Sequence, residues 1–183
     1  MRNIVAGLLM SVDGVVESPN TWGWARYMDE EMTRGIVAGV ALADAVLVGR
    51  VTYLDFAKLW PNQGSEVPMA DFLNQSPKYV VSTELEELEW GPGKVIKGDL
   101  ANELAALKGQ PGKNILIPGS PTLVRSLLRH GLLDELNLNI CPVVVGHGMR
   151  LFDEDPQEVR LKLVQSIALS SGVIGVTYQP VAT

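Results

Sequence analysis

Two stretches of the sequence place a glycine and a polar residue directly between an apolar run and a helix-like segment. The first is Gly49-Arg50, between "DAVLV" and "VTYLDFAKLW"; the second is Gly119-Ser120, between "NILIP" and "PTLVRSLLRHG". Where a strand runs into a helix in this way, the first N–H groups of the helix point outward and can bind an anion. Arg50 would add a guanidinium suited to a phosphate, and Thr52 a hydroxyl near it. The alternative is ordinary turn chemistry with a surface arginine, and the spacing leaves both interpretations open.

A third apolar run, "KYVV", ends in the polar pair Ser82 and Thr83. In an open α/β sheet, ligands bind beyond the carboxyl ends of the parallel strands. Three polar strand ends at one edge could therefore hold an extended phosphorylated ligand such as a dinucleotide.

The segment that follows the first apolar run carries a carboxylate and three aromatic rings. Asp13 stands where "NIVAGLLM" opens into a loop, and Trp22, Trp24 and Tyr27 lie within six residues of one another. The carboxylate could bind a polar headgroup, and the rings could stack on a flat heterocycle. The alternatives are an Asx turn that ends the strand, and rings that anchor the loop onto the core.

Composition and charge exclude several classes of function. The chain has 183 residues, of which 46% are hydrophobic, so we expect one globular domain over 1–183. The net charge of −6 argues against a nucleic-acid partner. No apolar run approaches the roughly 20 residues that span a membrane. The two histidines stand apart, so we expect no metal site. The single cysteine, Cys141, is compatible with a reducing cytoplasm.

The elements that must position these residues alternate between strands and helices. We expect strands over 3–10, 44–49, 78–83, 94–99 and 114–119. We expect helices that begin near residues 29, 50, 69, 99 and 120, with Asp99 and Ser120 as N-caps of the last two. The segment 161–181 reads as a hairpin around Ser-Ser-Gly. This order predicts a three-layer α/β/α fold whose mixed, mainly parallel sheet ends in a C-terminal antiparallel hairpin.

Five segments, in this order and spacing, carry a resemblance to a known family. They are "SVDG", "LVGRVTY", "KYVVST", "IPGSPTLVRSLLRHGLLDEL" and "PVVVGHGMRLF". Together they resemble the reductase domain of the bifunctional riboflavin-biosynthesis deaminase–reductase, which has the dihydrofolate reductase fold. The resemblance covers nearly the whole chain and implies NADPH as cofactor and hydride transfer as chemistry. The zinc motif of cytidine deaminases is absent from the sequence, so the chain resembles a stand-alone reductase domain.

The resemblance also implies roles for individual residues. Gly49, Arg50 and Thr52 would hold the adenosine-side phosphates, with Arg50 facing the 2′-phosphate. Ser82 and Thr83 would border the adenine ribose, and Leu9 would offer backbone near the nicotinamide. The residues that would wrap the pyrophosphate are Gly119, Ser120, Pro121, Thr122 and Leu123. Pro118 stands where dihydrofolate reductases usually have the first of two glycines, and it removes an N–H donor.

The implied activity is NADPH-dependent reduction of a ribosylaminopyrimidine or another pteridine-like heterocycle, similar to 5-amino-6-(5-phosphoribosylamino)uracil reductase. The alternative is a relative that binds NADP without turnover. Hydride transfer also needs a proton, for which Asp13 is the first candidate and Asp29 or Glu30 the second. Trp22 and Trp24 are the candidate substrate contacts. Because such relatives are typically dimers and the apolar hairpin needs cover, we expect a homodimer; the alternative is a monomer whose own loops cover the sheet edge.

Overall fold

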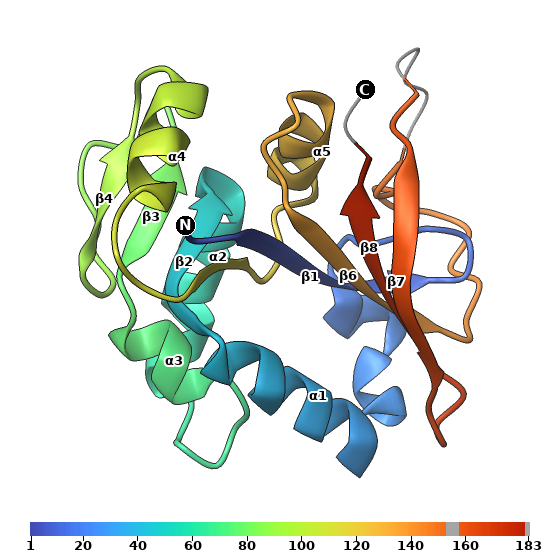
Figure 1. Cartoon of the computed structure of the whole chain (residues 1–183). Coiled ribbons are helices and arrows are strands. Elements are labelled where there is room, and N and C mark those ends of the chain that lie inside the picture. The colour runs from blue at the N-terminus through green and yellow to red at the C-terminus, as the bar shows by residue number, and fades with distance from the viewer. Residues whose placement is uncertain (153–157, 182–183) are drawn as a thin grey trace. The chain divides into compact units, whose positions relative to one another are not determined.

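The computed structural model describes residues 1–152 and 158–181 and divides the chain into two compact units that interleave along the sequence (Figure 1). The first unit comprises Met1–Ile4 and Gly35–Ser120, and the second comprises Val5–Arg34 together with the chain from Pro121 onward. Helix α1 (Glu30–Ala41) contains one of the boundaries between the units, which falls between Arg34 and Gly35. The expectation of one domain over 1–183 stays a prediction.

Four parallel strands form the sheet of the first unit, in the order β4-β3-β2-β5. Their bounds are Ala43–Gly49 for β2, Lys78–Val81 for β3, Gly93–Ile96 for β4 and Asn114–Ile117 for β5. β2 is buried along most of its length, as expected of a strand covered on both faces. β4 is shorter than the strand predicted over 94–99 and begins one residue earlier.

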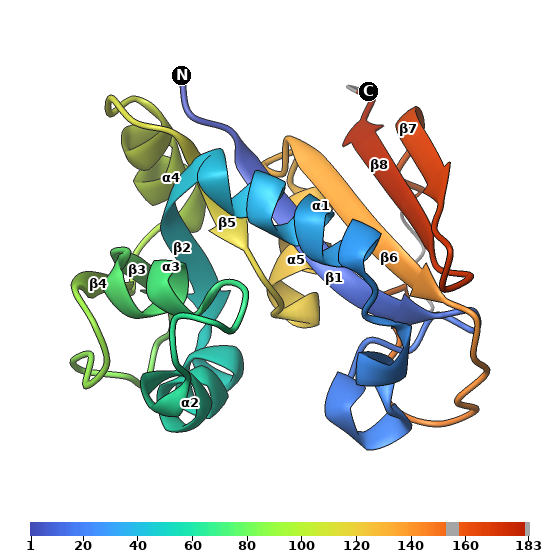
Figure 2. The same cartoon turned by 90° about the horizontal axis from the view of Figure 1, so that it is seen from below.

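Helices cover both faces of this sheet. They are α2 (Arg50–Leu59), α3 (Ala70–Gln75) and α4 (Leu100–Lys108), with a 3₁₀ turn at Trp60–Asn62. Val80 of β3 packs in one core cluster with Tyr53 of α2 and Leu73 of α3, and Figure 2 shows these two helices beside β2 and β3. Tyr79, the neighbour of Val80, points to the opposite face and lines a hollow with α4. Asp99 caps α4 as predicted, because its carboxylate accepts the N–H groups of the first turn.

The second unit contains β1 (Ile4–Ser11) from Val5 onward, with β6 (Glu135–Cys141), β7 (Leu161–Ala168) and β8 (Ile174–Pro180), in the order β1-β6-β8-β7. β1 and β6 run parallel, whereas β8 is antiparallel to both β6 and β7. Figure 1 shows β6, β8 and β7 side by side. The predicted hairpin over 161–181 is confirmed in the described residues, which end at 181, and with it the α/β fold class, mainly parallel with an antiparallel C-terminal end.

Two further kinds of element complete the second unit. Helix α5 spans Pro121–Arg129 and buries four aliphatic residues. The aromatic segment predicted as a plain loop contains two 3₁₀ turns, Pro19–Trp22 and Trp24–Tyr27. Among residues 1–152 and 158–181, none of the helices has the length and apolar character needed to cross a membrane.

Candidate functional site

The two glycine-containing junctions meet at one edge of the first unit. β2 and β3 run in register, with Gly49 opposite Val81, so both strands end together. The N–H of Gly49 donates a hydrogen bond of 2.9 Å to the hydroxyl of Ser120, which follows β5. The junctions at 49–50 and 119–120 therefore lie in contact although 71 residues separate them.

Gly119 brings the backbone after β5 against the first turn of α2. A Cβ built on Gly119 would lie 3.3 Å from Cγ2 of Thr52, and the φ of Gly119 is +157°. Ser120 has a φ of +61°, a left-handed conformation that costs a non-glycine residue of order 1 kcal/mol. This φ differs from the extended backbone usual at an N-cap, and the hydroxyl accepts the Gly49 N–H. Ser120 directly precedes α5, as predicted for its N-cap, and its side chain in addition links the two junctions.

The N-terminus of α2 is open to an anion. Its N-cap is Gly49, which has no side chain to accept the first N–H groups, and no acidic residue stands in the first turn. The helix dipole places partial positive charge at this end, so a negatively charged group is stabilised there. Arg50, the first residue of the helix, adds a full positive charge.

Arg50 lies beside the end of β3. Its Nη2 is 3.3 Å from Oε2 of Glu84, and the two side chains are 39% and 70% exposed. The hydroxyl of Ser82 accepts the N–H groups of Glu84 and Leu85 at 3.1 and 2.9 Å, which turns the chain back toward α2. That hydroxyl still has its own hydrogen to donate. Thr83 is exposed. The sequence prediction missed Glu84, although the acidic run "ELEELE" directly after Thr83 could have signalled it.

The structure thus brings seven of the predicted cofactor residues together in the first unit: Gly49, Arg50, Thr52, Ser82, Thr83, Gly119 and Ser120. Their donors are a guanidinium, hydroxyls and the N–H groups of a helix N-terminus, and the bare Cα of Gly119 leaves the backbone open. This donor set fits the phosphates and ribose of a dinucleotide.

The other four predicted cofactor residues belong to the second unit. Pro121, Thr122 and Leu123 form the first turn of α5, where Thr122 is exposed and Leu123 is buried. Leu9 of β1 is partly buried and packs against the cluster that contains Trp22. For the buried Leu123, only the backbone is available to a ligand.

The aromatic residues of the second unit have different surroundings. Trp22 is only 9% exposed, packs with Cys141 and Val173, and donates its indole N–H to the carbonyl of Glu17 at 3.2 Å. This ring anchors the segment onto the core, which is the alternative that the sequence left open. Trp24 and Tyr27 pack on the same cluster but stay partly exposed.

Asp13 is held by a set of hydrogen bonds. One carboxylate oxygen accepts the hydroxyl of Ser11 at 2.7 Å and the N–H of Val145 at 3.0 Å, and the other accepts the N–H of Gly146 at 2.8 Å. Nη2 of Arg150 lies 3.7 Å away. The Val145 N–H above all, followed by the Ser11 hydroxyl, holds the pKa of Asp13 well below its ordinary value. The geometry opposes the proton-donor interpretation and fits a structural tie from the end of β1 to 145–150.

Asp29 and its neighbours tie the N-terminus of α1 to the β7–β8 turn. Asp29 accepts the N–H of Met32 at 2.7 Å, the hydroxyl of Ser170 at 3.1 Å and the N–H of Ser171 at 3.0 Å. These bonds, the first of them most strongly, lower the pKa of Asp29 to about 2. Glu31, which the sequence prediction passed over, accepts the N–H of Ser170 at 3.0 Å.

The remaining candidate acid, Glu30, is exposed and pairs with Arg34 one turn along α1, at 3.3 Å. The surroundings of Asp13 and Asp29 lower the pKa of each carboxyl, which is the opposite of what a proton donor near neutral pH requires.

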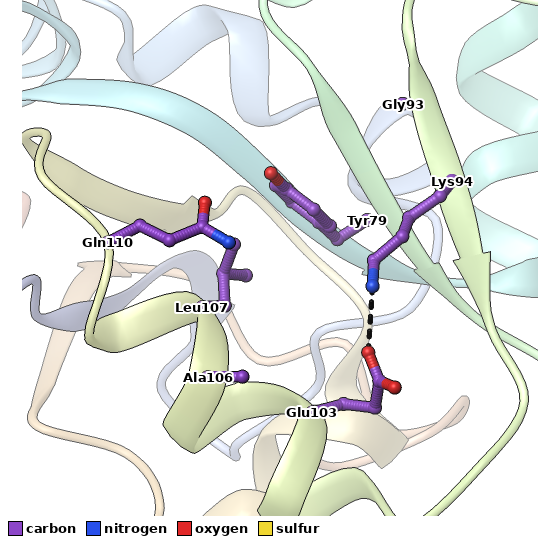
Figure 3. Close-up of a pocket in the computed structure, with 7 residues that line it drawn as sticks. All are labelled: Tyr79, Gly93, Lys94, Glu103, Ala106, Leu107 and Gln110. Atoms are coloured by element: carbon purple, nitrogen blue, oxygen red, sulfur yellow. Dashed lines mark hydrogen bonds and ion pairs between the residues drawn. The ribbon is translucent and has the colours of Figure 1, made fainter.

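A separate hollow of about 420 Å³ lies in the first unit between α4 and the strands β3 and β4 (Figure 3). Its lining residues are Tyr79, Gly93, Lys94, Glu103, Ala106, Leu107 and Gln110. Lys94 and Glu103 form an ion pair of 2.8 Å across it. It contains none of the predicted site residues. Within the described ranges, no three His, Cys, Asp or Glu side chains group as metal ligands.

Comparison with known proteins identifies the family. The model of a family described as the RibD C-terminal domain matches residues 2–175. The uncharacterized protein YyaP of Bacillus subtilis (strain 168) is 30% identical over 181 residues, which cover 97% of this chain and 94% of that protein.

Two crystal structures have the same fold. A protein from Shewanella sp. PV-4 whose name refers to riboflavin biosynthesis superposes with a TM-score of 0.79 at 22% identity, over 100% of both chains. A pyrimidine reductase-like protein from Corynebacterium diphtheriae superposes with a TM-score of 0.69 at 18% identity, over 100% of this chain and 93% of that chain. The resemblance read from the five sequence segments is confirmed, and the chain belongs to the RibD C-terminal domain family.

Proposed function

We propose that this protein is an NADPH-dependent reductase of a heterocyclic substrate, with a ribosylaminopyrimidine or another pteridine-like ring as the substrate class. The observation that carries the proposal is the hydrogen bond from Gly49 to Ser120, which joins two glycine-containing junctions beside Arg50. Membership of the family and the reductase-like name of the Corynebacterium neighbour support it.

The first unit would bind the phosphorylated part of the cofactor. The N–H groups at the start of α2 and the guanidinium of Arg50 would neutralise phosphate charge, and Ser82 and Thr83 would donate to the ribose side. Gly119 would let the backbone approach the pyrophosphate without a Cβ in the way. Bound NADPH would supply the hydride.

The second unit would bind the substrate ring. The partly exposed rings of Trp24 and Tyr27 are the side chains suited to stacking, while the buried Trp22 holds the segment in place. Asp13 would position the chain at 145–150 through its bonds to Val145 and Gly146 and would not deliver a proton.

A second candidate function is dinucleotide binding without turnover. The observation that favours it is the engagement of Asp13 and Asp29 in structural hydrogen bonds that keep both ionised. Under this function, NADPH binds but no heterocycle accelerates its oxidation.

Two measurements separate these functions. A fluorescence titration of the purified protein with NADPH should show saturable binding to one site per chain, and absence of binding would refute both candidates. A panel of pyrimidine and pteridine-like heterocycles should then cause the reduced-nicotinamide absorbance to fall. Saturable binding with no fall for any member of the panel would select the binding-only alternative.

The assembly we propose is a homodimer. β7 is an edge strand whose Leu163, Val164 and Ile167 are 51%, 50% and 49% exposed, so a second copy would remove apolar surface from water. Light scattering at micromolar concentration should give twice the mass of one chain; a mass near 19.8 kDa would contradict the dimer. The free, buried Cys141 is consistent with the cytoplasm as the proposed location.

A further inference from the structure

The guanidinium assigned to the cofactor phosphate already has an anionic neighbour within the chain. Nη2 of Arg50 lies 3.3 Å from a carboxylate oxygen of Glu84, and both side chains reach solvent. The carboxylate therefore marks a position where the first turn of α2 accepts negative charge. A ligand phosphate that uses Arg50 at this position must displace Glu84.

The backbone around Glu84 is fixed, so the pairing has a structural cause. Ser82 accepts the N–H groups of both Glu84 and Leu85, and its own N–H donates to the carbonyl of Ile96 in β4. These bonds direct the chain after β3 back toward the start of α2. Glu86, two residues further along, pairs instead with Lys97, at 2.7 Å.

The chemistry of this pair differs for the two common dinucleotides. A 2′-phosphate carries negative charge, so it competes with the Glu84 carboxylate for the guanidinium of Arg50. A 2′-hydroxyl carries a hydrogen that a carboxylate can accept, so the unphosphorylated ribose has no such conflict. Glu84 thus lowers affinity for the phosphorylated cofactor and leaves the unphosphorylated one unaffected or favoured.

We propose that Glu84 is a specificity-determining residue, which reduces the preference for NADPH over NADH by occupying Arg50. The inference rests on the proposed function, because it assumes that Arg50 faces the 2′-phosphate. It predicts that this protein prefers NADPH over NADH less strongly than it would with Arg50 unpaired.

The test is the pair of dissociation constants for NADPH and NADH, measured by fluorescence titration at one ionic strength. In Glu84→Gln, which keeps the shape and an acceptor oxygen, NADPH should bind about fivefold more tightly, the equivalent of one exposed ion pair. Affinity for NADH should stay the same or fall by up to about twofold. The only change for NADH is that its 2′-hydroxyl donates to a neutral amide oxygen in place of a carboxylate.

Two further variants show whether the effect passes through Arg50. Glu86→Gln removes the same charge from the same segment, but from a carboxylate that pairs with Lys97. The ratio of NADPH affinity to NADH affinity should therefore not change. In an Arg50→Met background, Glu84→Gln should improve NADPH binding by less than about twofold, because Glu84 then has no guanidinium to occupy.

The outcomes distinguish the inference from the function on which it rests. The inference is supported if the ratio of NADPH affinity to NADH affinity rises in Glu84→Gln and stays constant in Glu86→Gln. An unchanged ratio in Glu84→Gln, or an equal rise in both variants, overturns it while NADPH binding by the wild type upholds the proposed function. Failure of the wild type and every variant to bind either dinucleotide overturns the proposed function, and the inference with it.

Discussion

Two helix N-termini of this molecule have opposite surroundings. Helix α1 begins after Asp29, whose carboxylate accepts the N–H of Met32, and Glu30 and Glu31 occupy its first turn. Helix α2 begins after Gly49, which has no side chain, and its first residue is Arg50. The same backbone feature is thus neutralised within the chain in one helix and left for an anion in the other.

The comparison teaches where binding capacity remains. In the second unit, the carboxylates of Asp13 and Asp29 accept hydrogen bonds from N–H groups that lie more than 130 residues away in the sequence. In the first unit, the junctions around Gly49 and Gly119 have helix N–H groups without a side-chain cap and a guanidinium that pairs with Glu84. We therefore propose that the first unit binds the ligand, whereas Asp13 and Asp29 of the second unit hold the fold together.

The largest effect we expect follows from a side chain at Gly119. In Gly119→Val, the Cβ would meet Thr52 at 3.3 Å and the backbone would hold a φ of +157°, so the junction must move away from α2. We predict that the NADPH dissociation constant rises about 100-fold, the upper range of such backbone strain. Gly98→Val is the control, because no heavy atom lies within 4 Å of a Cβ there. Equal affinities in the two variants would remove Gly119 from the site.

Removal of the Arg50 guanidinium should have the next largest effect. We predict that Arg50→Ala weakens NADPH binding about tenfold, as expected for one charge-assisted contact, and changes NADH binding by less than about twofold. Titration of the wild type and of Arg50→Ala with both dinucleotides measures this. An equal loss for NADPH and NADH would show that Arg50 does not face the 2′-phosphate.

Asp13→Asn tests whether the acids of the second unit are structural. An amide cannot accept at both ends, so the bonds from Val145 and Gly146 cannot both form. We predict a lower urea midpoint of unfolding, with NADPH affinity within about twofold of the wild type because Asp13 is not among the residues proposed to bind the cofactor. A variant of unchanged stability whose turnover falls tenfold or more would restore Asp13 as a catalytic acid.

The pH dependence of stability should show the smallest effect and follows from the depressed pKa values of Asp13 and Asp29. Because the pKa of Asp29 falls from 3.8 to about 2 on folding, the unfolded chain takes up the proton at higher pH than the folded one. The stabilisation is therefore complete above pH 4 and is lost as the pH falls from about 4 toward 2. Urea midpoints between pH 7 and 2 should show this loss, and Asp29→Asn should reduce it. A loss centred near neutral pH would contradict the assignment.

The sequence predicted the parts of this account that depend on local pattern. Apolar runs followed by glycine and a helix signal located the junctions at Gly49 and Gly119, and parallel strands necessarily bring such ends to one edge. The hairpin around Ser170 and the cap at Asp99 also follow from neighbours in the chain. These features need no knowledge of which distant segments meet.

The partners of the acids could not be predicted in this way. Asp13 meets Val145, and Asp29 meets Ser170 and Ser171, across more than 130 residues of sequence. A carboxylate in a loop shows that an acceptor is present but not which N–H groups the fold will bring to it. The two 3₁₀ turns that bury Trp22 depend likewise on packing against Cys141 and Val173.

The central claim is that the N-terminus of α2 binds the cofactor because its N-cap leaves the N–H groups open. Gly49→Asp would give α2 the cap that α1 has, and the backbone allows it, since a Cβ there meets Ser120 Oγ at 3.7 Å, an ordinary contact. NADPH titration of this variant against Gly49→Ala is the most direct test. We predict that Gly49→Ala stays within about threefold of the wild type, whereas Gly49→Asp weakens binding at least about tenfold without loss of stability. Equal NADPH affinity in the two variants would contradict the claim.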